Sequence, residues 1–222
     1  MVTIDNASEK DVKYTTEISE LIESAAKKRG TGIAKRSPSY LEEKILTGKS
    51  VIAKTESGKL IGFCYIESWG HQDFVATSGL IVKDDYRGLG ISKKIKEKAF
   101  ELSRKKFPQA KLFSITTSIA VMKLNMRMGY EPVTLENLTD DDQFWKGCQG
   151  CVNYPILQQT ERKHCLCTGL LYDPEKSDNI DKKTKAFKIY SRWFKYKLQV
   201  LSKYAKPKKA LKKVKELSFL SF

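Results

Sequence analysis

Hydrophobic and polar positions change their period several times along the chain, and each change marks a predicted element. The spacing at 8–28 is helical and follows a cap at Ser8. A second short helix is predicted at 37–45, with Ser37 as its N-cap and Pro38 at the first helical position. The chain therefore opens with two helices.

The next part of the chain has the period of β-strands. Apolar runs at 50–54 and 59–68 are joined by Glu56-Ser57-Gly58, which is a hairpin signal, and a third strand is predicted at 74–82. After these come, in order, a helix, a strand, a helix and two strands, at 88–106, 111–117, 119–128, 130–135 and 165–172. This order predicts an α/β domain with a mixed sheet.

Charge divides the chain into two parts. The net charge of the 222 residues is +15, but residues 182–222 hold 14 Lys and Arg against one acid, Glu216. Residues 1–181 keep the other 27 bases and 25 acids, a balance of only +2. We therefore predict a near-neutral domain at 1–172, with a Cys-rich segment at 145–167, followed by a basic helical tail at 173–222.

The basic, amphipathic pattern of the tail predicts that it binds a partner or packs against another surface. Its apolar residues from 180 to 204 share one helical stripe, and a second helix opens at Pro207. Such helices bind anionic membranes or nucleic acid, or pack on the domain or on a second subunit of a homodimer. The aromatic residues of the stripe favour packing on the domain or on a second subunit over binding to a membrane or nucleic acid. With no apolar run of about 18 residues and no leader-like start, we expect a cytoplasmic protein.

A glycine-containing turn between a predicted strand and a predicted helix is the most informative stretch. Arg87-Gly88-Leu89-Gly90 follows the strand ending at 80–82 and leads directly into the helix. Glycines let the backbone approach a ligand, and the N–H groups at a helix start attract phosphate oxygens. Lys93 breaks the dinucleotide pattern G-x-G-x-x-G, and the G-K-[ST] of a P-loop is absent. A tight structural turn is the alternative.

This stretch resembles motif A of the GNAT superfamily of N-acetyltransferases, [QR]-x-x-G-x-[GA]. Arg87, Gly90 and Ser92 fill its three positions, and Ser92 is a small-residue departure. The element order also agrees over residues 2–172. The resemblance implies a GNAT-type mixed central sheet with flanking helices, acetyl-CoA as cosubstrate, and a coenzyme A site made of Leu80, Ile81, Val82, Arg87, Gly88, Leu89, Gly90, Ile91 and Ser92.

Further segments resemble the acyltransferase domain of the N-acetylglutamate synthases of arginine biosynthesis. They are residues 33–42, which resemble an Arg-Arg-Ser segment before a Leu-Glu helix, residues 111–133, and residues 161–164. The resemblance implies L-glutamate as the acceptor, and guanidinium groups suit the two carboxylates of glutamate. Acetyl-CoA and succinyl-CoA both stay open as the donor. The implied substrate site consists of Arg36, Thr116, Thr117 and Arg162; alternatively, the arginines are solvated surface bases and the threonines cap a helix.

The acid–base chemistry is less clearly marked. The acceptor amine must be neutral to attack the thioester, and backbone N–H groups near Leu80–Val82 are candidate donors to the developing oxyanion. Residues 76–79 lack the Glu that many GNAT relatives use, and Asn125 stands where they have a thiolate-protonating Tyr. The remaining catalytic candidates, each with a structural role as the alternative, are Glu67, His71, Asp73 and Tyr130.

Four cysteines form two close pairs, C-x-x-C and C-x-C, separated by thirteen residues. Two close pairs of thiolates are typical of a structural zinc site. The alternative is four thiols without a metal. The predicted zinc ligands are Cys148, Cys151, Cys165 and Cys167.

The leading hypothesis is therefore an acyl-CoA-dependent N-acyltransferase acting on an amino acid. A second enzyme hypothesis keeps the fold and takes a protein N-terminus, a polyamine or an antibiotic as acceptor. A third hypothesis is a binding module in which zinc and the basic tail engage RNA or a membrane and the acyltransferase fold is inert. The intact Arg87–Gly90 turn argues against an inert fold.

Overall fold

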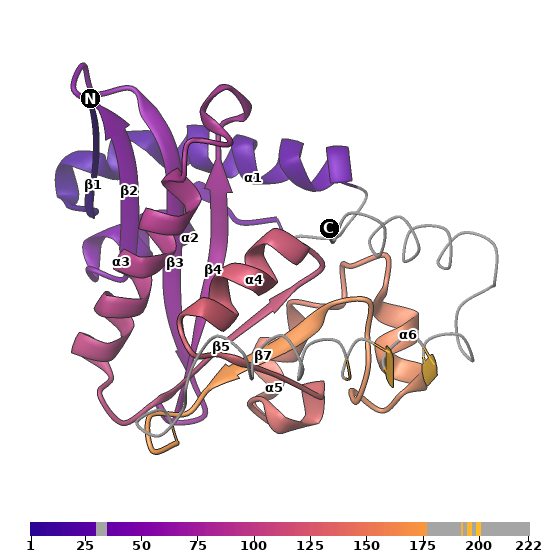
Figure 1. The fold of residues 1–222 in the computed structure, drawn as a ribbon. Helices are drawn as coiled ribbons and strands as arrows, with labels where there is room; N and C mark the ends of the chain where they lie inside the picture. The colour runs from indigo at the N-terminus through magenta and orange to yellow at the C-terminus, as the bar shows by residue number, and fades with distance from the viewer. Residues whose placement is uncertain (30–34, 177–191, 193–194, 197–198, 201–222) are drawn as a thin grey trace. The chain divides into compact units, whose positions relative to one another are not determined.

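A computed structural model describes residues 1–29, 35–176, 192, 195–196 and 199–200 (Figure 1). The seven strands follow the order β1-β2-β3-β4-β5-β7-β6 in one sheet. The strands are β1 (Val2–Asn6), β2 (Ser50–Thr55), β3 (Leu60–Trp69), β4 (Phe74–Val82), β5 (Lys111–Thr116), β6 (Glu131–Val133) and β7 (Thr168–Tyr172).

Helices lie between β1 and β2 and after β4, whereas β2, β3 and β4 follow one another directly. The α-helices are α1 (Thr15–Arg29), α2 (Pro38–Leu46), α3 (Ile91–Lys106), α4 (Ile119–Arg127), α5 (Asp142–Lys146) and α6 (Tyr154–Gln159), and the 3-10 helices are η1 (Glu9–Tyr14), η2 (Asp84–Tyr86) and η3 (Leu135–Asn137). No helix in the described part of the chain is long and apolar enough to cross a membrane.

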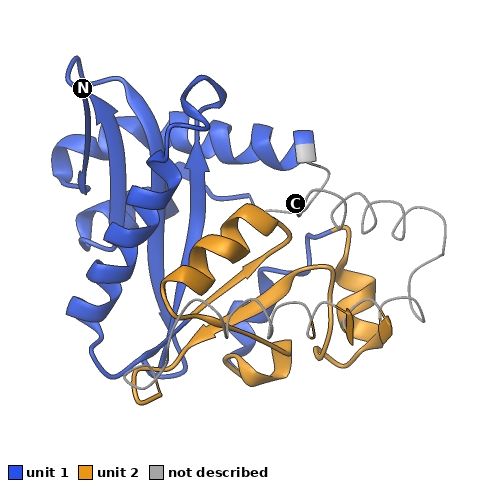
Figure 2. Cartoon of the chain, in the orientation of Figure 1, with its two compact units in different colours: residues 1–112, 141–151 blue, residues 113–140, 152–222 orange. Residues whose placement is uncertain are grey.

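The chain divides into two compact units (Figure 2). Unit 1 comprises residues 1–112 and 141–151, and unit 2 comprises residues 113–140 and 152–222. In unit 1, β1–β2, β2–β3 and β3–β4 are antiparallel pairs. In unit 2, β6 and β7 are antiparallel.

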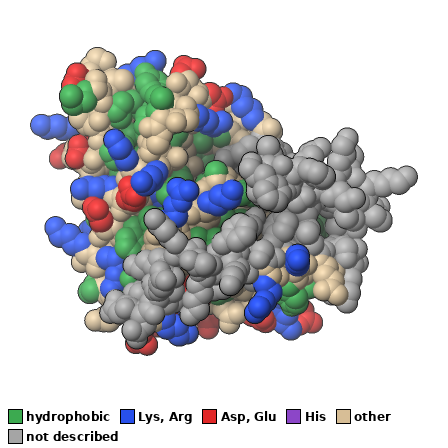
Figure 3. All heavy atoms as spheres, viewed as in Figure 1, with side chains coloured by type: hydrophobic (Ala, Val, Ile, Leu, Met, Phe, Trp, Pro, Cys, Tyr) green, Lys and Arg blue, Asp and Glu red, His purple; other side chains and the backbone are tan. Residues whose placement is uncertain are grey.

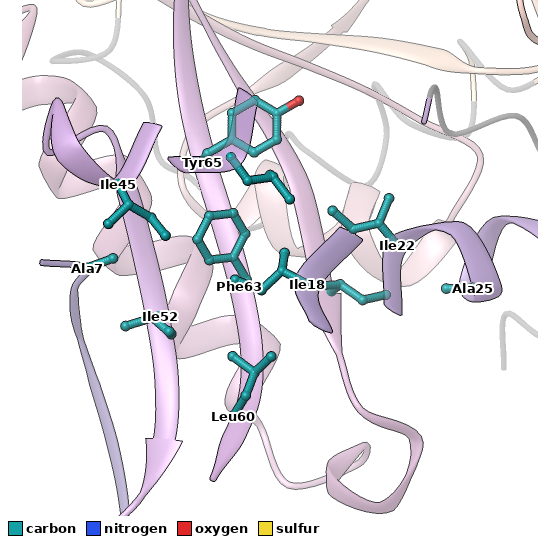
Figure 4. Close-up of a cluster of buried hydrophobic side chains, with 11 residues drawn as sticks. Ala7, Ile18, Ile22, Ala25, Ile45, Ile52, Leu60, Phe63 and Tyr65 are labelled. Carbon is teal, nitrogen blue, oxygen red and sulfur yellow. The ribbon is translucent and has the colours of Figure 1, made fainter. Parts of the chain in front are cut away.

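Helices α1 and α2 pack on one face of the sheet in unit 1. A cluster of buried side chains joins Ile18 and Ile22 of α1 to Phe63 and Tyr65 of β3 and Ile81 of β4 (Figure 4). Each of these side chains is at most 3% exposed. Burying apolar side chains of this size stabilises the unit by about 1.5–3 kcal/mol each.

Helix α3 covers the opposite face of the same strands. A Cβ placed on Gly62 of β3 would lie 2.8 Å from Ile95 Cδ1 of α3, so the helix approaches the sheet closely there. Lys96 of α3 contacts Thr77 of β4 on this face. The alternation of side chains along β3 and β4 therefore separates an α1–α2 face from an α3 face.

Most predicted elements are confirmed, and the differences have local causes. The first helix begins at Thr15, because Ser8 and Asp11 form a capping box that starts a 3-10 helix instead. Helix α2 has the predicted Ser37 cap, with Tyr40 N donating to Ser37 Oγ at 3.2 Å. Helix α3 begins three residues later than predicted, because Gly88 and Gly90 are left-handed.

The described surface carries side chains of both charges (Figure 3). On the face in Figure 3, Lys and Arg side chains lie among Asp and Glu side chains. The predicted helical tail falls, apart from residues 173–176, 192, 195–196 and 199–200, outside the described residues.

Candidate active site

The turn between β4 and α3 is an open cradle of backbone donors in unit 1. Gly88 and Gly90 have φ values of 81° and 74°, and nothing within 4 Å faces the position of a Cβ on either. Among the described residues, no acceptor pairs with the N–H groups of 88–92, whereas Lys93 N and Lys94 N donate to Gly90 O. Clustered unpaired N–H groups at a helix start bind phosphate oxygens.

Arg87 borders this cradle. Its Nη2 lies 2.8 Å from Asp84 Oδ1, and its Nε donates to Val82 O at 3.3 Å. The lowered pKa of Asp84 has as its causes the hydrogen bond from Lys28 and then the charge of Arg87. The two bonds fix Arg87 beside the turn, in the arrangement expected of a phosphate site.

A bulge interrupts β4 shortly before this turn. Tyr65 pairs with Ser78 and Phe63 pairs with Ile81, so Gly79 and Leu80 together face one residue of β3. Gly79 has a φ of +65°, and a Cβ there would lie 2.6 Å from Tyr65 Cε1. Only glycine fits such a position. The bulge takes Leu80 out of the regular ladder and leaves its backbone available for a ligand.

Arg36 lies over two tyrosine rings in the same unit. Its Nε donates to the Tyr65 hydroxyl at 2.6 Å, and its guanidinium carbon lies 5.4 Å from the Tyr40 ring centroid and 6.0 Å from that of Tyr65. Burial on its own would lower the pKa of Arg36, but Tyr65, Tyr40 and Glu67 more than offset it and raise the pKa. Arg36 is therefore a fixed, half-buried cation.

Glu67 on β3 belongs to an ion-pair network. Its carboxylate contacts the ammonium of Lys44, lies 3.8 Å from Lys49 Nζ, and accepts the Tyr40 hydroxyl at 2.8 Å. Burial would lower the pKa of Lys44, but Glu43 and Glu67 raise it overall. Burial, Tyr65 and Glu67 raise the pKa of Tyr40. These contacts give Glu67 a structural role in holding α2 on β3.

The other two acidic or basic candidates of unit 1 lie far along the β3–β4 hairpin from the phosphate turn. His71 and Asp73 are exposed in the tight turn between β3 and β4, and His71 has a φ of 53°. The nine residues of β4 lie between them and Lys83, a span of about 30 Å at ~3.3 Å per residue. The geometry therefore does not favour a catalytic role for either.

Four further candidates belong to unit 2. Thr116 Oγ1 accepts the N–H of Ser118 at 3.0 Å, so Thr116 supports the start of α4, and Thr117 is adjacent to it. Arg162 has a left-handed backbone, with φ of 64°, and its N–H donates to Leu157 O. Tyr130 is 2% exposed and packs against Tyr172 with centroids 5.8 Å apart. The convergence of Arg36 and Arg162 on one pocket stays a prediction.

The predicted zinc site is not supported. Within the described residues, which include all four of the cysteines concerned, no group of three or more His, Cys, Asp or Glu could hold a metal ion. Cys148 and Cys151 lie in a turn in unit 1, where Cys151 N donates to Cys148 O. Cys165 is buried, and its thiol donates to Asn153 O at 3.9 Å, while Cys167 directly precedes β7. The spacing of the pairs alone does not establish a metal site, because it carries no information on where each pair lies in the fold.

Sequence reasoning missed two groups close to the bulge. Tyr65 shares a strand face with Glu67, and this two-residue spacing was the available signal. Lys96, 1% exposed on α3, donates to Thr77 beside the bulge. Burial lowers the pKa of Lys96 to about 8 and raises the pKa of the nearby Cys64 thiol to about 11.

Comparison with known proteins agrees with this geometry. The chain matches the Acetyltransferase (GNAT) family over residues 18–130, which is just over half of its length. It belongs to this family, and it is an acyl-CoA-dependent N-acetyltransferase. No curated protein sequence matches the chain.

Solved structures share the fold at low identity. The chain is similar to N-acetylglutamate synthase from Neisseria gonorrhoeae, complexed with coenzyme A and N-acetyl-glutamate (TM-score 0.55, 17% identity, 78% of this chain). It spans 35% of the length of that synthase chain. It is also similar to a putative acetyltransferase, YncA, from Salmonella typhimurium with acetyl-CoA. The TM-score is 0.55 at 14% identity, and the match covers 82% of this chain and 98% of that one.

A third similar structure is the diaminobutyrate acetyltransferase EctA from Paenibacillus lautus, in complex with L-2,4-diaminobutyric acid and coenzyme A. Its TM-score is 0.53 at 13% identity, and the match covers 81% of this chain and 99% of that one. At these identities the likenesses establish the fold alone.

Proposed function

We propose that this acetyltransferase transfers an acetyl or succinyl group from coenzyme A to the α-amine of an amino acid, with L-glutamate as the first choice. The observation that carries the proposal is Arg36, a cation stacked on two tyrosine rings beside the β4 bulge. A guanidinium fixed in this way suits a carboxylate of the acceptor.

The donor side of the proposed site is the turn between β4 and α3. The unpaired N–H groups of 88–92 and the side chain of Arg87 are suited to the pyrophosphate of coenzyme A. The left-handed glycines at 88 and 90 keep side chains away from the bound phosphates. A phosphate bound here aligns the rest of the donor with β4.

The reacting end of the donor belongs at the bulge. There the backbone near Leu80 supplies N–H donors to the carbonyl oxygen, which becomes negative as the amine attacks. The neutral amine adds to the thioester carbon, the carbon–sulfur bond breaks, and the amine proton leaves to solvent or to the departing thiolate. Positioning of the two reactants supplies much of the rate, and no side chain of the chain is assigned as the base.

Two comparisons support an amino-acid acceptor. The structure of the gonococcal synthase contains N-acetyl-glutamate, and that of EctA contains a diamino acid. Both of these molecules carry an α-carboxylate. A place in arginine biosynthesis, a homodimer and a partner for the basic tail stay predictions of the sequence.

A thiol-release assay tests the proposal. The parent enzyme is supplied with acetyl- or succinyl-CoA and with glutamate, glutamine, 2,4-diaminobutyrate or a polyamine. We expect glutamate to be acylated best. Equal rates with glutamate, glutamine and the polyamine would leave only a general acetyltransferase.

Two substitutions test the carboxylate site. Arg36→Ala and Arg162→Ala should each raise the KM for glutamate about tenfold or more, because a carboxylate then loses a charged hydrogen-bond donor. Affinity for acetyl-CoA should stay within about twofold. Arg127→Ala, at an exposed position on α4, is the matched control. An unchanged KM in either variant removes that arginine from the site.

A further inference from the structure

Tyr65 links two parts of the candidate active site. Its ring packs on the bulge of β4, where Cε1 lies 2.6 Å and Cδ1 2.8 Å from the place that a Cβ on Gly79 would occupy. Its hydroxyl oxygen accepts the Nε–H of Arg36 at 2.6 Å. A single side chain thus connects the backbone of the bulge to the guanidinium.

The ring of Tyr65 is held on several sides. Tyr65 is 1% exposed, and it meets Tyr40 edge-on at a centroid distance of 5.6 Å. The centroid of its ring lies 6.4 Å from that of Phe63, and Figure 4 shows these two rings. A buried aromatic side chain has only two torsions, and packing of this kind leaves it a single position. Tyr65 is therefore a rigid spacer.

Arg36 is held by the same group of residues. Its guanidinium stacks on the rings of Tyr40 and Tyr65, and its backbone carbonyl accepts the Ser19 hydroxyl at 2.6 Å. Stacking restrains the plane of a guanidinium but allows it to rotate within that plane. The hydrogen bond from Nε to the Tyr65 hydroxyl opposes this rotation.

We infer that Tyr65 is a positioning residue that sets the distance between the acceptor's carboxylate and the acyl carbonyl of the donor. The inference rests on the proposed function, in which Arg36 binds the carboxylate and the bulge binds the carbonyl. With both groups fixed through one ring, an α-amine next to the carboxylate is delivered to a defined point. Acceptors without a carboxylate gain nothing from this arrangement.

The size of the effect follows from the bond that is lost. Tyr65→Phe removes only the hydroxyl and leaves the ring on Gly79. The guanidinium then rotates, and a displacement of about 1 Å is enough to lower the rate by one to two orders of magnitude. We expect kcat/KM for glutamate to fall about tenfold or more, because hydrogen bonds to charged groups are strong.

The experiment is a double-mutant cycle with Tyr65→Phe and Arg36→Ala in the full-length enzyme. We measure kcat/KM for the best amino acid and for a polyamine, the dissociation constants of glutamate and acetyl-CoA by calorimetry, and the melting temperature. Tyr65→Phe should lower kcat/KM for glutamate and weaken glutamate binding. It should leave kcat/KM for the polyamine and the affinity for acetyl-CoA within about twofold of the parent. In the Arg36→Ala background the same change should have no further effect. Tyr14→Phe is the matched control, because it removes a hydroxyl that donates to Gly58 O at another turn.

The outcomes separate this inference from the proposed function. Equal losses with glutamate and the polyamine, or full additivity of the two changes, would overturn the positioning role and leave the proposed function intact. A parent enzyme that acylates only amines without a carboxylate, and does not bind glutamate, would overturn both. A loss confined to the melting temperature would assign Tyr65 to packing alone.

Discussion

Gly79→Ala tests how closely the ring of Tyr65 packs on the bulge of β4. The added Cβ would lie 2.6 Å from Tyr65 Cε1 and 2.8 Å from Tyr65 Cδ1. Ordinary contacts between carbon atoms are about 3.5–4.0 Å, so the ring or the bulge must move. The φ of +65° adds a second penalty for any residue with a Cβ.

The two penalties have different sizes. A left-handed backbone costs an alanine about 1–2 kcal/mol. Overpacking a well-packed core costs about 1–3 kcal/mol more. We therefore expect Gly79→Ala to lower the free energy of unfolding by about 2–5 kcal/mol.

Gly48 provides the matched control. Its φ is +63°, and its nearest contacts would be the flexible end of Lys106 at 3.6 and 3.8 Å. Gly48→Ala should therefore show the backbone penalty alone, about 1–2 kcal/mol. Urea titrations followed by circular dichroism measure both variants under the same conditions.

The difference between the variants carries the conclusion. Gly79→Ala should be the less stable of the two by about 1–3 kcal/mol. If the two alanine variants unfold at the same urea concentration, Tyr65 does not pack on the bulge, and the argument that the ring acts as a spacer fails with it.

Three further predictions address the other parts of unit 1. Gly90→Val should reduce acetyl-CoA affinity about a hundredfold in calorimetry, because a β-branched residue is strained at φ of +74° and displaces the backbone donors; unchanged binding would move the phosphate site elsewhere. Glu67→Gln should lower the unfolding free energy by about 2–3 kcal/mol, because the buried Lys44 ammonium keeps only Glu43, whereas Glu20→Gln on the exposed face of α1 should change it little. Burial lowers the pKa of Lys96 to about 8, below the value near 10.4 of an unfolded chain, so the unfolded state binds more protons from about pH 8 upward and stability should rise with pH there. The Cys64 thiol opposes this rise from about pH 8.5, because its pKa is about 11 in the folded protein and about 8.5 in an unfolded chain. Since Cys64 is present in both proteins, urea titrations at pH 7.5–9 should show a less positive slope for Lys96→Met than for the parent; an equal slope in both proteins would contradict the assignment.

Local signals in the sequence were enough to predict most of the elements. Ser37 and Pro38 marked the start of α2 correctly, since capping depends only on neighbouring residues. The 74–82 strand was predicted to the residue. The short strand β1 was missed, because its side chains are mostly exposed and show no hydrophobic pattern.

The candidate site was only partly predictable. The turn before α3 was recognisable as a candidate phosphate site because its glycines and the helix that follows are contiguous. The contact of Arg36 with Tyr65 joins residues 29 positions apart, and no local pattern records it. Spacing along the chain likewise carries no information on where the two cysteine pairs lie in space, and no metal-binding group is found among the described residues.

The bulge of β4 also sets the phase of the strand. Before it, Thr77 points to the α3 face and contacts Lys96; after it, Ile81 is on the α1–α2 face and Val82 lies opposite Gly62. Odd positions therefore lie on the α3 face before the bulge, and even positions lie there after it. Deleting one of the two bulge residues would restore a continuous ladder and leave both halves of the strand on their present faces, whereas a deletion or insertion elsewhere in β4 would turn part of the strand over and direct its core side chains to the wrong layer. Insertions and deletions in β4 outside the bulge should therefore be far less tolerated than substitutions, and the bulge is where the strand can lose a residue without a change of phase.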